Sequence, residues 1–336
     1  MAIVKTGHIN TDKYLAFVAE STFQTPIADT AVFSKFHLLG NTVPAFVPVQ
    51  FVDKPRLNRG KNMVSVSDAY MTENAQTQRY EIPEFICPIN NLSQFLYGVC
   101  QNVSEGATTP FVKTYTMDGS VDPDFSSDAG FFFTLLIAQP IASESQKLTS
   151  CVFEKLTIKI SPENGGRAVC SGTVISMSGH TMTANPTGAN VYTSVAPPDF
   201  HNATSTLTIG SQDLVYEEME FTIETDYDWI GYNAGNCENM KVVNQKVSFR
   251  AVAKYDSNSD ILMRSKGTDI GALAFDIGTD AATGYLSLAS PETWIDDVKE
   301  VDSEDEVNKL EISGDCLLSA SSGPVIEAAD AVDRSW

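Results

Sequence analysis

Three segments of the sequence alternate apolar and polar residues with a period of two. They are Lys155–Ser161 (KLTIKIS), Glu217–Glu224 (EEMEFTIE) and Lys246–Lys254 (KVSFRAVAK). Side chains on a β-strand point alternately to opposite faces, so each segment predicts a strand with one buried and one solvated face. A chain built from such segments is expected to fold mainly as antiparallel sheets.

Further strand patterns and a single helical pattern complete the expected fold. The further strands are predicted over residues 13–19, 44–52, 77–87, 110–117, 130–138, 168–178, 204–210 and 271–278. The segment 89–99 (INNLSQFLYGV) follows Pro88 and repeats apolar residues at helical spacing, which predicts an amphipathic helix. We therefore expect a mainly β fold, a β-sandwich or half-barrel with one flanking α-helix.

The charge of the chain restricts its partners. The 336 residues include 43 acids and 22 bases, giving a net charge of −21. So acidic a surface repels nucleic acid, which excludes an ordinary DNA-binding domain. A protein that stays near DNA without binding it remains possible on these grounds.

No segment predicts a membrane span or a metal site. The N-terminus lacks the apolar region of a secretory signal, and the longest apolar run, Gly130–Ala138, is too short to cross a bilayer as a helix. The six cysteines form no C-x-x-C pair and the four histidines are scattered. We expect a soluble protein made in a cytoplasm, with no membrane partner, no metal and no cofactor.

The sequence also lacks the common catalytic motifs, including H-E-x-x-H, G-x-S-x-G and phosphate-binding glycine loops. Asn164–Arg167 (NGGR) lies between two strand patterns and predicts a hairpin turn, and Asp256–Asp260 (DSNSD) predicts a polar turn rather than a calcium loop. Asp226–Asn233 (DYDWIGYN) mixes acids with aromatic rings and is the best candidate for the active or sugar-binding site of a carbohydrate-active protein. We expect no catalytic residues and favour a structural protein.

Two blocks of charge stand out along the chain. The segment 53–62 carries four bases, Lys54, Arg56, Arg59 and Lys61, against one acid, which predicts a basic loop. From Pro291 to Trp336 there are 13 acids and 3 bases. We predict a β domain over residues 1–285 and an acidic C-terminal extension or arm over 286–336. Both blocks are also compatible with ordinary solvated surface.

Three segments resemble a known family. Tyr14–Pro26 (YLAFVAESTFQTP) resembles the N-terminal signature of tail tube proteins of tailed bacteriophages, in which a first strand leads into an acidic residue, a Ser/Thr, an aromatic residue and a Gly-Thr-Pro-like turn. The matching residues are Glu20, Ser21 or Thr22, Phe23, and Gln24-Thr25-Pro26. The departure is Gln24, where glycine is common.

Two later segments add to this resemblance. Lys147–Ser176 looks like the strand–turn–strand unit of the family, and Ser205–Asp228 is similar to its later hairpin. The helix at 89–99 also lies where these proteins place a flanking helix. The resemblance implies a non-enzymatic subunit that completes a large β-barrel on hexamer assembly, with the rings stacking into a tube in the virion tail through which DNA passes without specific binding.

The resemblance implies places for the charged residues. The acids Glu218, Glu220 and Glu224 are candidates for the lumen. The bases are candidates for contacts between subunits: Lys54, Arg56, Arg59, Lys61, Lys246, Arg250 and Lys254. In the rival placement, the acidic and basic stripes pair across one sheet.

Expected partners are further copies of the chain and sheath, neck, tape-measure or baseplate proteins. The alternatives are another β-rich phage protein of the baseplate or capsid surface, or an acidic β-sandwich enzyme acting on carbohydrate.

Overall fold

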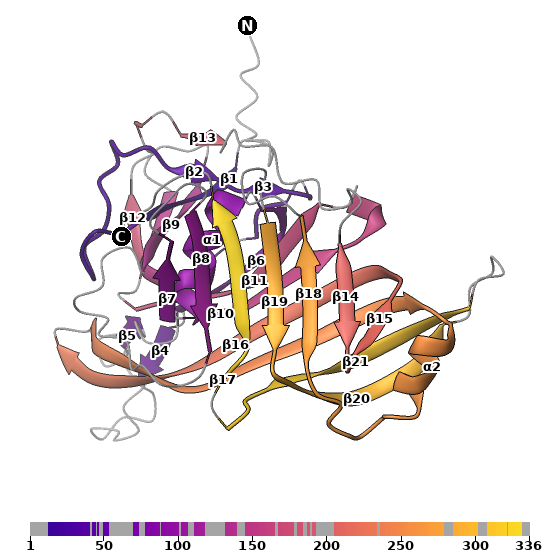
Figure 1. Cartoon of the computed structure of the whole chain (residues 1–336). Helices are drawn as coiled ribbons and strands as arrows, with labels where there is room; N and C mark the ends of the chain where they lie inside the picture. Colours follow the sequence, from indigo (N-terminus) through magenta and orange to yellow (C-terminus); the bar gives the residue numbers. More distant parts are fainter. Residues whose placement is uncertain are drawn as a thin grey trace, which may run out of the picture.

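The computed structural model describes most of the chain (Figure 1). The described residues are 13–40, 42–44, 46, 50–53, 70–73, 78–87, 89–100, 102–106, 111–117, 132–139, 145–164, 167–177, 180–183, 187–188, 190–192, 205–233, 236–278, 285–301, 308–320 and 322–330. The fold is mainly β, as the alternating segments predict, and its strands form two large sheets and one small hairpin.

The larger sheet has thirteen strands among the described residues. They are β1 (Tyr14–Ala19), β2 (Ser34–Lys35), β3 (His37–Leu38), β6 (Gln78–Ile86), β9 (Phe133–Ala138), β10 (Ser145–Ile160), β11 (Ala168–Ser176), β12 (His180–Thr183), β13 (Val191–Tyr192), β16 (Tyr216–Asn233), β17 (Asn236–Lys254), β20 (Glu292–Val301) and β21 (Lys309–Leu317). Its main path runs β13-β2-β1-β9-β10-β16-β17-β21-β20, and the sheet is not closed into a barrel.

The second sheet has seven strands in the described part of the chain, in the order β15-β14-β18-β19-β22-β8-β7. They are β7 (Asn102–Glu105), β8 (Phe111–Thr116), β14 (Thr206–Ile209), β15 (Gln212–Leu214), β18 (Leu273–Ile277), β19 (Tyr285–Ser290) and β22 (Val325–Asp330). Figure 1 shows this sheet in front of the long strands β16 and β17, which cross it at a steep angle. A separate hairpin pairs β4 (Gln50–Asp53) with β5 (Tyr70–Glu73).

The core lies between the two sheets. The apolar positions of the alternating segments point into it: Leu156, Ile158, Met219, Phe221, Ile223, Val247 and Phe249 are all buried. Phe221 of β16 meets Phe275 of β18 with ring centroids 6.5 Å apart, so the two sheets share one core. The predicted buried faces of these strands are confirmed.

Helix α1 (Ile89–Cys100) confirms the predicted helix, although it is more enclosed than an amphipathic surface helix. Every residue from Leu92 to Cys100 is buried, including Ser93 and Gln94 on its polar side. The Phe95 ring packs among aromatic rings of β1, β6, β9 and β10. The last carbonyl groups of a helix have no hydrogen-bond donors within the helix. When the helix end is buried, other parts of the protein must supply these donors.

Side chains of the long hairpin β16–β17 supply these partners. The Val99 carbonyl accepts from Thr225 Oγ1 at 2.8 Å and from Gln245 Nε2 at 3.0 Å, while the Gly98 carbonyl accepts from the Tyr227 hydroxyl at 2.9 Å. Helix and hairpin are therefore fixed to each other.

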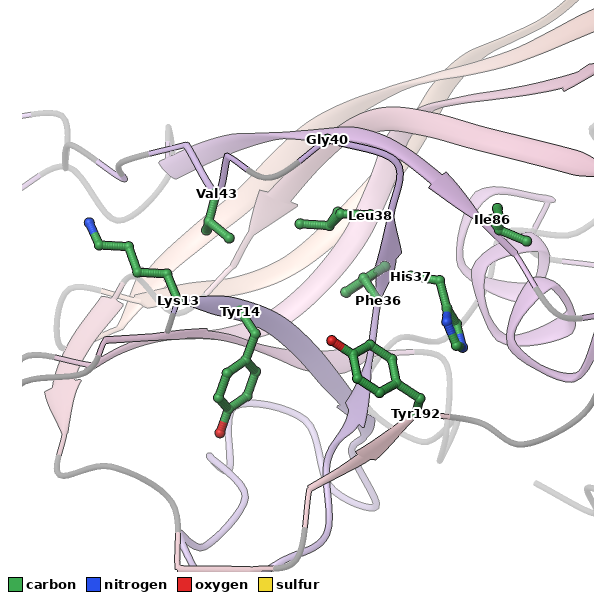
Figure 2. A pocket seen from close by; sticks show the side chains of 9 residues that line it. All are labelled: Lys13, Tyr14, Phe36, His37, Leu38, Gly40, Val43, Ile86 and Tyr192. Carbon is green, nitrogen blue, oxygen red and sulfur yellow. The ribbon is translucent and has the colours of Figure 1, made fainter. Parts of the chain in front are cut away.

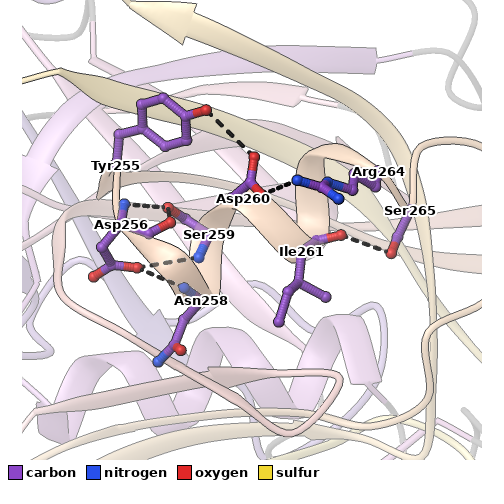
Figure 3. Close-up of polar contacts among 8 residues, drawn as sticks. All are labelled: Tyr255, Asp256, Asn258, Ser259, Asp260, Ile261, Arg264 and Ser265. Atoms are coloured by element: carbon purple, nitrogen blue, oxygen red, sulfur yellow. Dashed lines mark hydrogen bonds and ion pairs between the residues drawn. The ribbon is translucent and has the colours of Figure 1, made fainter.

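A second helix, α2 (Ser257–Met263), occupies the segment predicted as a polar turn. Asp256 is its N-cap and accepts from the backbone N–H groups of Asn258 and Ser259 at 3.0 and 3.1 Å (Figure 3). The Ser259 hydroxyl accepts in turn from the Asp256 N–H at 2.8 Å, which completes a capping box. The side-chain oxygens of Asp256 and Ser259 in DSNSD thus accept hydrogen bonds from backbone N–H groups at the N-terminus of α2.

The described residues between 285 and 330, which belong mostly to the predicted acidic extension, contribute strands to both sheets. Strand β21 pairs with β17, β20 pairs with β21, and β22 lies between β19 and β8. Strands β10 and β11 pair as an antiparallel hairpin, as NGGR predicts, and a 3-10 turn over Pro162–Asn164 follows β10. The predicted strand at 44–52 overlaps β4 only at its end.

Candidate assembly surfaces

The solvated side of the long strands carries interleaved charges of both signs, here called the charged face. Its basic residues are Lys155, Lys159, Lys246, Arg250, Lys254, Lys299 and Lys309, and its acidic residues are Glu217, Glu218, Glu220, Glu224, Glu292, Asp296, Asp297, Glu311 and Asp315. Acids are only slightly in excess on this face, so most of the net charge of −21 arises elsewhere in the chain.

Arg250 is the centre of this face. Its guanidinium nitrogens contact Glu218 Oε1 at 2.5 Å and Glu311 Oε2 at 2.6 Å, so it joins three neighbouring strands. Glu218 also contacts Lys159 Nζ at 3.2 Å. The hydrogen bond from Arg250 lowers the pKa of Glu311, and the bond to Glu311 raises the pKa of Arg250.

Two further pairs extend the face along the same strands. Lys155 Nζ lies 2.5 Å from Glu224 Oε1, and Lys246 Nζ lies 2.9 Å from Asp315 Oδ2. Such exposed pairs contribute about 0–1 kcal/mol each. Their main effect is to neutralise charge locally within one chain.

The edge strand β20 continues the charged face. Asp297 pairs with Lys266 and with Lys299, and these two partners, Lys266 first, lower the pKa of Asp297 to about 2. On the same face Trp294 is 39% exposed, and Leu317, diagonal to it on β21, is also exposed. We call these two residues the edge patch.

The Glu20 carboxylate lies at the other side of the sheet, where β1 ends. It is buried and accepts from Thr134 Oγ1 at 2.5 Å, from the Ser150 N–H at 2.8 Å and from Ser150 Oγ at 2.8 Å. Burial raises the pKa of Glu20 although these hydrogen bonds act in the opposite direction. Ser150 Oγ also accepts from the Gln24 N–H at 2.8 Å.

This network surrounds a bulge in β10. The register between β10 and β9 shifts between Leu148 and Cys151, and Ser150 has a φ of 51°. Gln24 also has a positive φ, 58°, a conformation that glycine adopts with less strain. Glu20 therefore fixes an irregular part of the backbone.

A cavity of about 380 Å³ opens beside β1, β3 and β13 (Figure 2). Its lining combines aromatic, aliphatic and basic residues: Lys13, Tyr14, Phe36, His37, Leu38, Gly40, Val43, Ile86 and Tyr192. The ring of Tyr192 is 52% exposed and its centroid lies 4.8 Å from that of His37. Lys35 Nζ lies 4.4 Å from the Tyr14 ring centroid and 5.4 Å from that of Tyr192.

The comparison with protein families identifies the chain. The family model described as phage tail tube protein matches residues 103–333, which is more than half of the sequence. The chain belongs to the phage tail tube protein family. No curated protein matches it. The matched range contains two of the three segments that resemble the family, Lys147–Ser176 and Ser205–Asp228. The third segment, Tyr14–Pro26, lies before the matched range.

The structure brings some of the predicted site residues of this tail tube protein together. Arg250 pairs with Glu218, which joins the two predicted stripes, whereas Glu224 pairs with Lys155 and Lys246 pairs with Asp315, outside them. Glu220 lies opposite Arg250 and Lys159 but forms no ion pair with any described residue. Whether these residues face a lumen or another subunit stays a prediction.

The four predicted basic residues of the loop, Lys54, Arg56, Arg59 and Lys61, lie outside the described residues, in the connection between β4 and β5. The structure also adds features that sequence patterns did not indicate. The partners of Glu20, the cavity and the edge patch each combine residues far apart in the sequence, so no local spacing could have revealed them.

Two negative findings apply to the tail tube protein. None of the described helices is long and apolar enough to cross a membrane. In the described ranges no three His, Cys, Asp or Glu side chains gather closely enough to hold a metal ion.

Proposed function

We propose that this structural subunit of the phage tail assembles into hexameric rings that stack into a tube, and that DNA passes through the bore during genome ejection. The rings assemble in the host cytoplasm and become part of the virion tail. Sheath, neck, tape-measure or baseplate proteins contact the tube. Membership in the tail tube family supports this proposal.

The observation that carries the proposal is the open edge of the large sheet. On the outer side of β20, backbone groups of residues 267–270 form hydrogen bonds with the backbone of Thr293 and Ile295. Residues 297–301 of β20 have no backbone partner there within the described part of the chain. An unpaired edge is a template for another strand, and closing a ring of copies removes such edges.

The long hairpin supports the same assembly. Strand β10 pairs with β16 only as far as Glu224, and β21 pairs with β17 only from Val247. Beyond these residues β16 and β17 pair with each other alone among the described strands, and Figure 1 shows this part projecting past the sheet. We expect this arm to contact a neighbouring copy.

We place Glu218, Glu220 and Glu224 at the bore. Interleaved charges of both signs leave no continuous basic stripe to hold phosphates, so DNA can slide over such a surface. Glu220, which has no ion pair with a described residue, contributes most to a negative potential there. The bases of the loop 53–62 contact acidic surface of neighbouring copies.

Electron microscopy of the concentrated protein tests this function. We expect hollow tubes of even width, and native mass spectrometry of the smallest closed species should give six copies. Closed rings that never stack would instead favour a baseplate or capsid-decorating subunit. A monomer at every concentration would contradict the proposal and favour the carbohydrate-active alternative.

A further inference from the structure

Two exposed apolar surfaces lie at opposite ends of the main path of the large sheet. One is the cavity beside β1, β3 and β13, where the lining residue Tyr192 is 52% exposed. The other is the edge patch on β20 and β21. The path of the sheet begins at β13 and ends at β20, and Figure 1 shows these strands far apart.

The edge patch has the form of a knob. Trp294 and Leu317 lie diagonally across β20 and β21 on the charged face, since Trp294 is opposite Asp315 and Glu292 is opposite Leu317. Diagonal neighbours across a strand pair are within reach of an aromatic side chain. Tryptophan is also the residue type most enriched at energetic centres of protein interfaces.

The cavity has the form of a matching hole. Its inner lining is apolar, with Phe36, Leu38, Val43 and Ile86, and its rim carries the rings of Tyr14 and Tyr192 (Figure 2). A volume of about 380 Å³ exceeds that of one indole side chain. Aromatic rings lining a pocket favour offset or edge-on contacts with an inserted ring.

The charges around the two surfaces are opposite. Lys13 lines the cavity and Lys35 lies over its two tyrosine rings. Beside Trp294, Asp297 and Asp315 are neutralised by lysine partners, while Glu292 and Asp296 of the edge strand form no ion pair with a described residue. Opposite charges at the rims orient two surfaces and disfavour the wrong register.

We infer that Trp294 of one copy inserts into the cavity lined by Tyr14, His37 and Tyr192 of the next copy, head to tail. The partner is a second copy of this chain, because Glu292 and Asp296 beside its edge patch complement the basic rim of the cavity. A head-to-tail contact between two different surfaces closes into a ring when its rotation closes. The inference rests on the proposed ring assembly and identifies one contact within it.

Photocrosslinking tests the contact directly. Benzoylphenylalanine replaces Trp294, and isotopically light and heavy subunits are mixed before illumination and mass spectrometry. We expect light–heavy crosslinks from position 294 to peptides containing Tyr14, His37 or Tyr192. The same probe at Ile261, which is 48% exposed on α2, is the control and should not reach these peptides.

Mixed variants test the head-to-tail geometry. Trp294→Ser and Tyr192→Ser should each raise the concentration for half-assembly about thirty-fold, since a central interface residue typically contributes that much. Ile261→Ser should not. A mixture of the two variants retains one intact contact, Trp294 of one chain in the cavity of the other, so it should give heterodimers and no rings.

The outcomes separate this contact from the proposed function. Tubes with crosslinks that lead elsewhere, or tubes of Trp294→Ser that form at the wild-type concentration, overturn the contact and leave the function standing. Crosslinks to the cavity without tubes support the contact and contradict the function. A protein that stays monomeric contradicts both.

Discussion

At the scale of single residues, Glu20 and Gln24 depend on a bulge more than a hundred positions away in the sequence. Ser150 lies in that bulge and bonds to both, through the Glu20 carboxylate and the Gln24 N–H. The motif that resembles the tail tube signature therefore has a structural role here. It joins the end of β1 to the irregular part of β10.

Replacing Gln24 by glycine should stabilise the protein. A φ of 58° strains a side-chain-bearing residue by about 1–2 kcal/mol, and glycine adds about 0.5–1 kcal/mol of unfolded-state entropy, so a net gain of about 0.5–1 kcal/mol is expected. Urea unfolding of the unassembled chain measures it. Ser21→Gly, in the same turn at an ordinary φ, is the control and should lower stability; equal losses in both variants would contradict the prediction.

Glu20 should make stability depend on pH. Its folded-state pKa is raised, so the folded protein binds this proton more tightly than the unfolded chain. The resulting stabilisation is present below the ordinary glutamate pKa and is lost as pH rises through the raised folded value. Glu20→Gln keeps the shape but cannot titrate, so it should be stabilised relative to wild type as pH rises through this window.

Denaturant unfolding of wild type and Glu20→Gln across this pH range measures the difference. The exposed Glu163→Gln, in the turn between β10 and β11, is the control and should track the wild type. A wild-type minus Glu20→Gln difference that does not change with pH would show that Glu20 does not titrate in this window.

At the scale of elements, two glycines face bulges in neighbouring strands, and each lies beneath a phenylalanine ring. A Cβ on Gly172 would lie 2.1 Å from the Lys155 carbonyl oxygen and 3.0 Å from the Phe153 ring. One on Gly314 would lie 2.1 Å from the Trp294 carbonyl oxygen and 3.0 Å from the Phe249 ring. The facing strands shift register at these points, after Phe153 and after Ile295.

Gly314→Ala should therefore destabilise the sheet. The added methyl must displace either the backbone of β20 or the Phe249 ring, which typically costs about 1–3 kcal/mol. Thermal or urea unfolding measures the loss. Gly106→Ala is the control, because its nearest atoms lie at 3.6 Å, and it should change stability by less than about 0.5 kcal/mol. Equal effects in the two variants would show that the close approach at Gly314 is relieved without cost.

At the scale of the whole molecule, the acidic excess and the charged face are distinct features. The charged face carries acids in only slight excess over bases, while the chain as a whole is strongly acidic. Copies of such a chain repel one another at long range and need specific contacts to assemble. An open sheet with different surfaces at its two ends provides such contacts.

Glu220→Lys tests the lumenal placement without breaking an ion pair between described residues. Glu224→Lys is less suitable, because it would place two lysines beside each other at the Lys155 contact. We expect particles built with Glu220→Lys to assemble and to release their genome more slowly, since a bore lysine attracts phosphate. Glu163→Lys changes the net charge equally and is the control. Equal release rates for both variants would argue against a bore position for Glu220.

The sequence by itself determined the three alternating strands, their buried faces and the helix predicted at 89–99, because these depend on periodicities of two and 3.6 residues along a local segment. It also carried the resemblance that the family comparison confirmed. Only the tertiary structure decided which strands are neighbours, that Arg250 forms ion pairs with both Glu218 and Glu311, and that Ser150 donates hydrogen bonds to Glu20. These contacts join residues far apart in the chain, and strand pairing and register are set by packing of the whole core rather than by any local pattern.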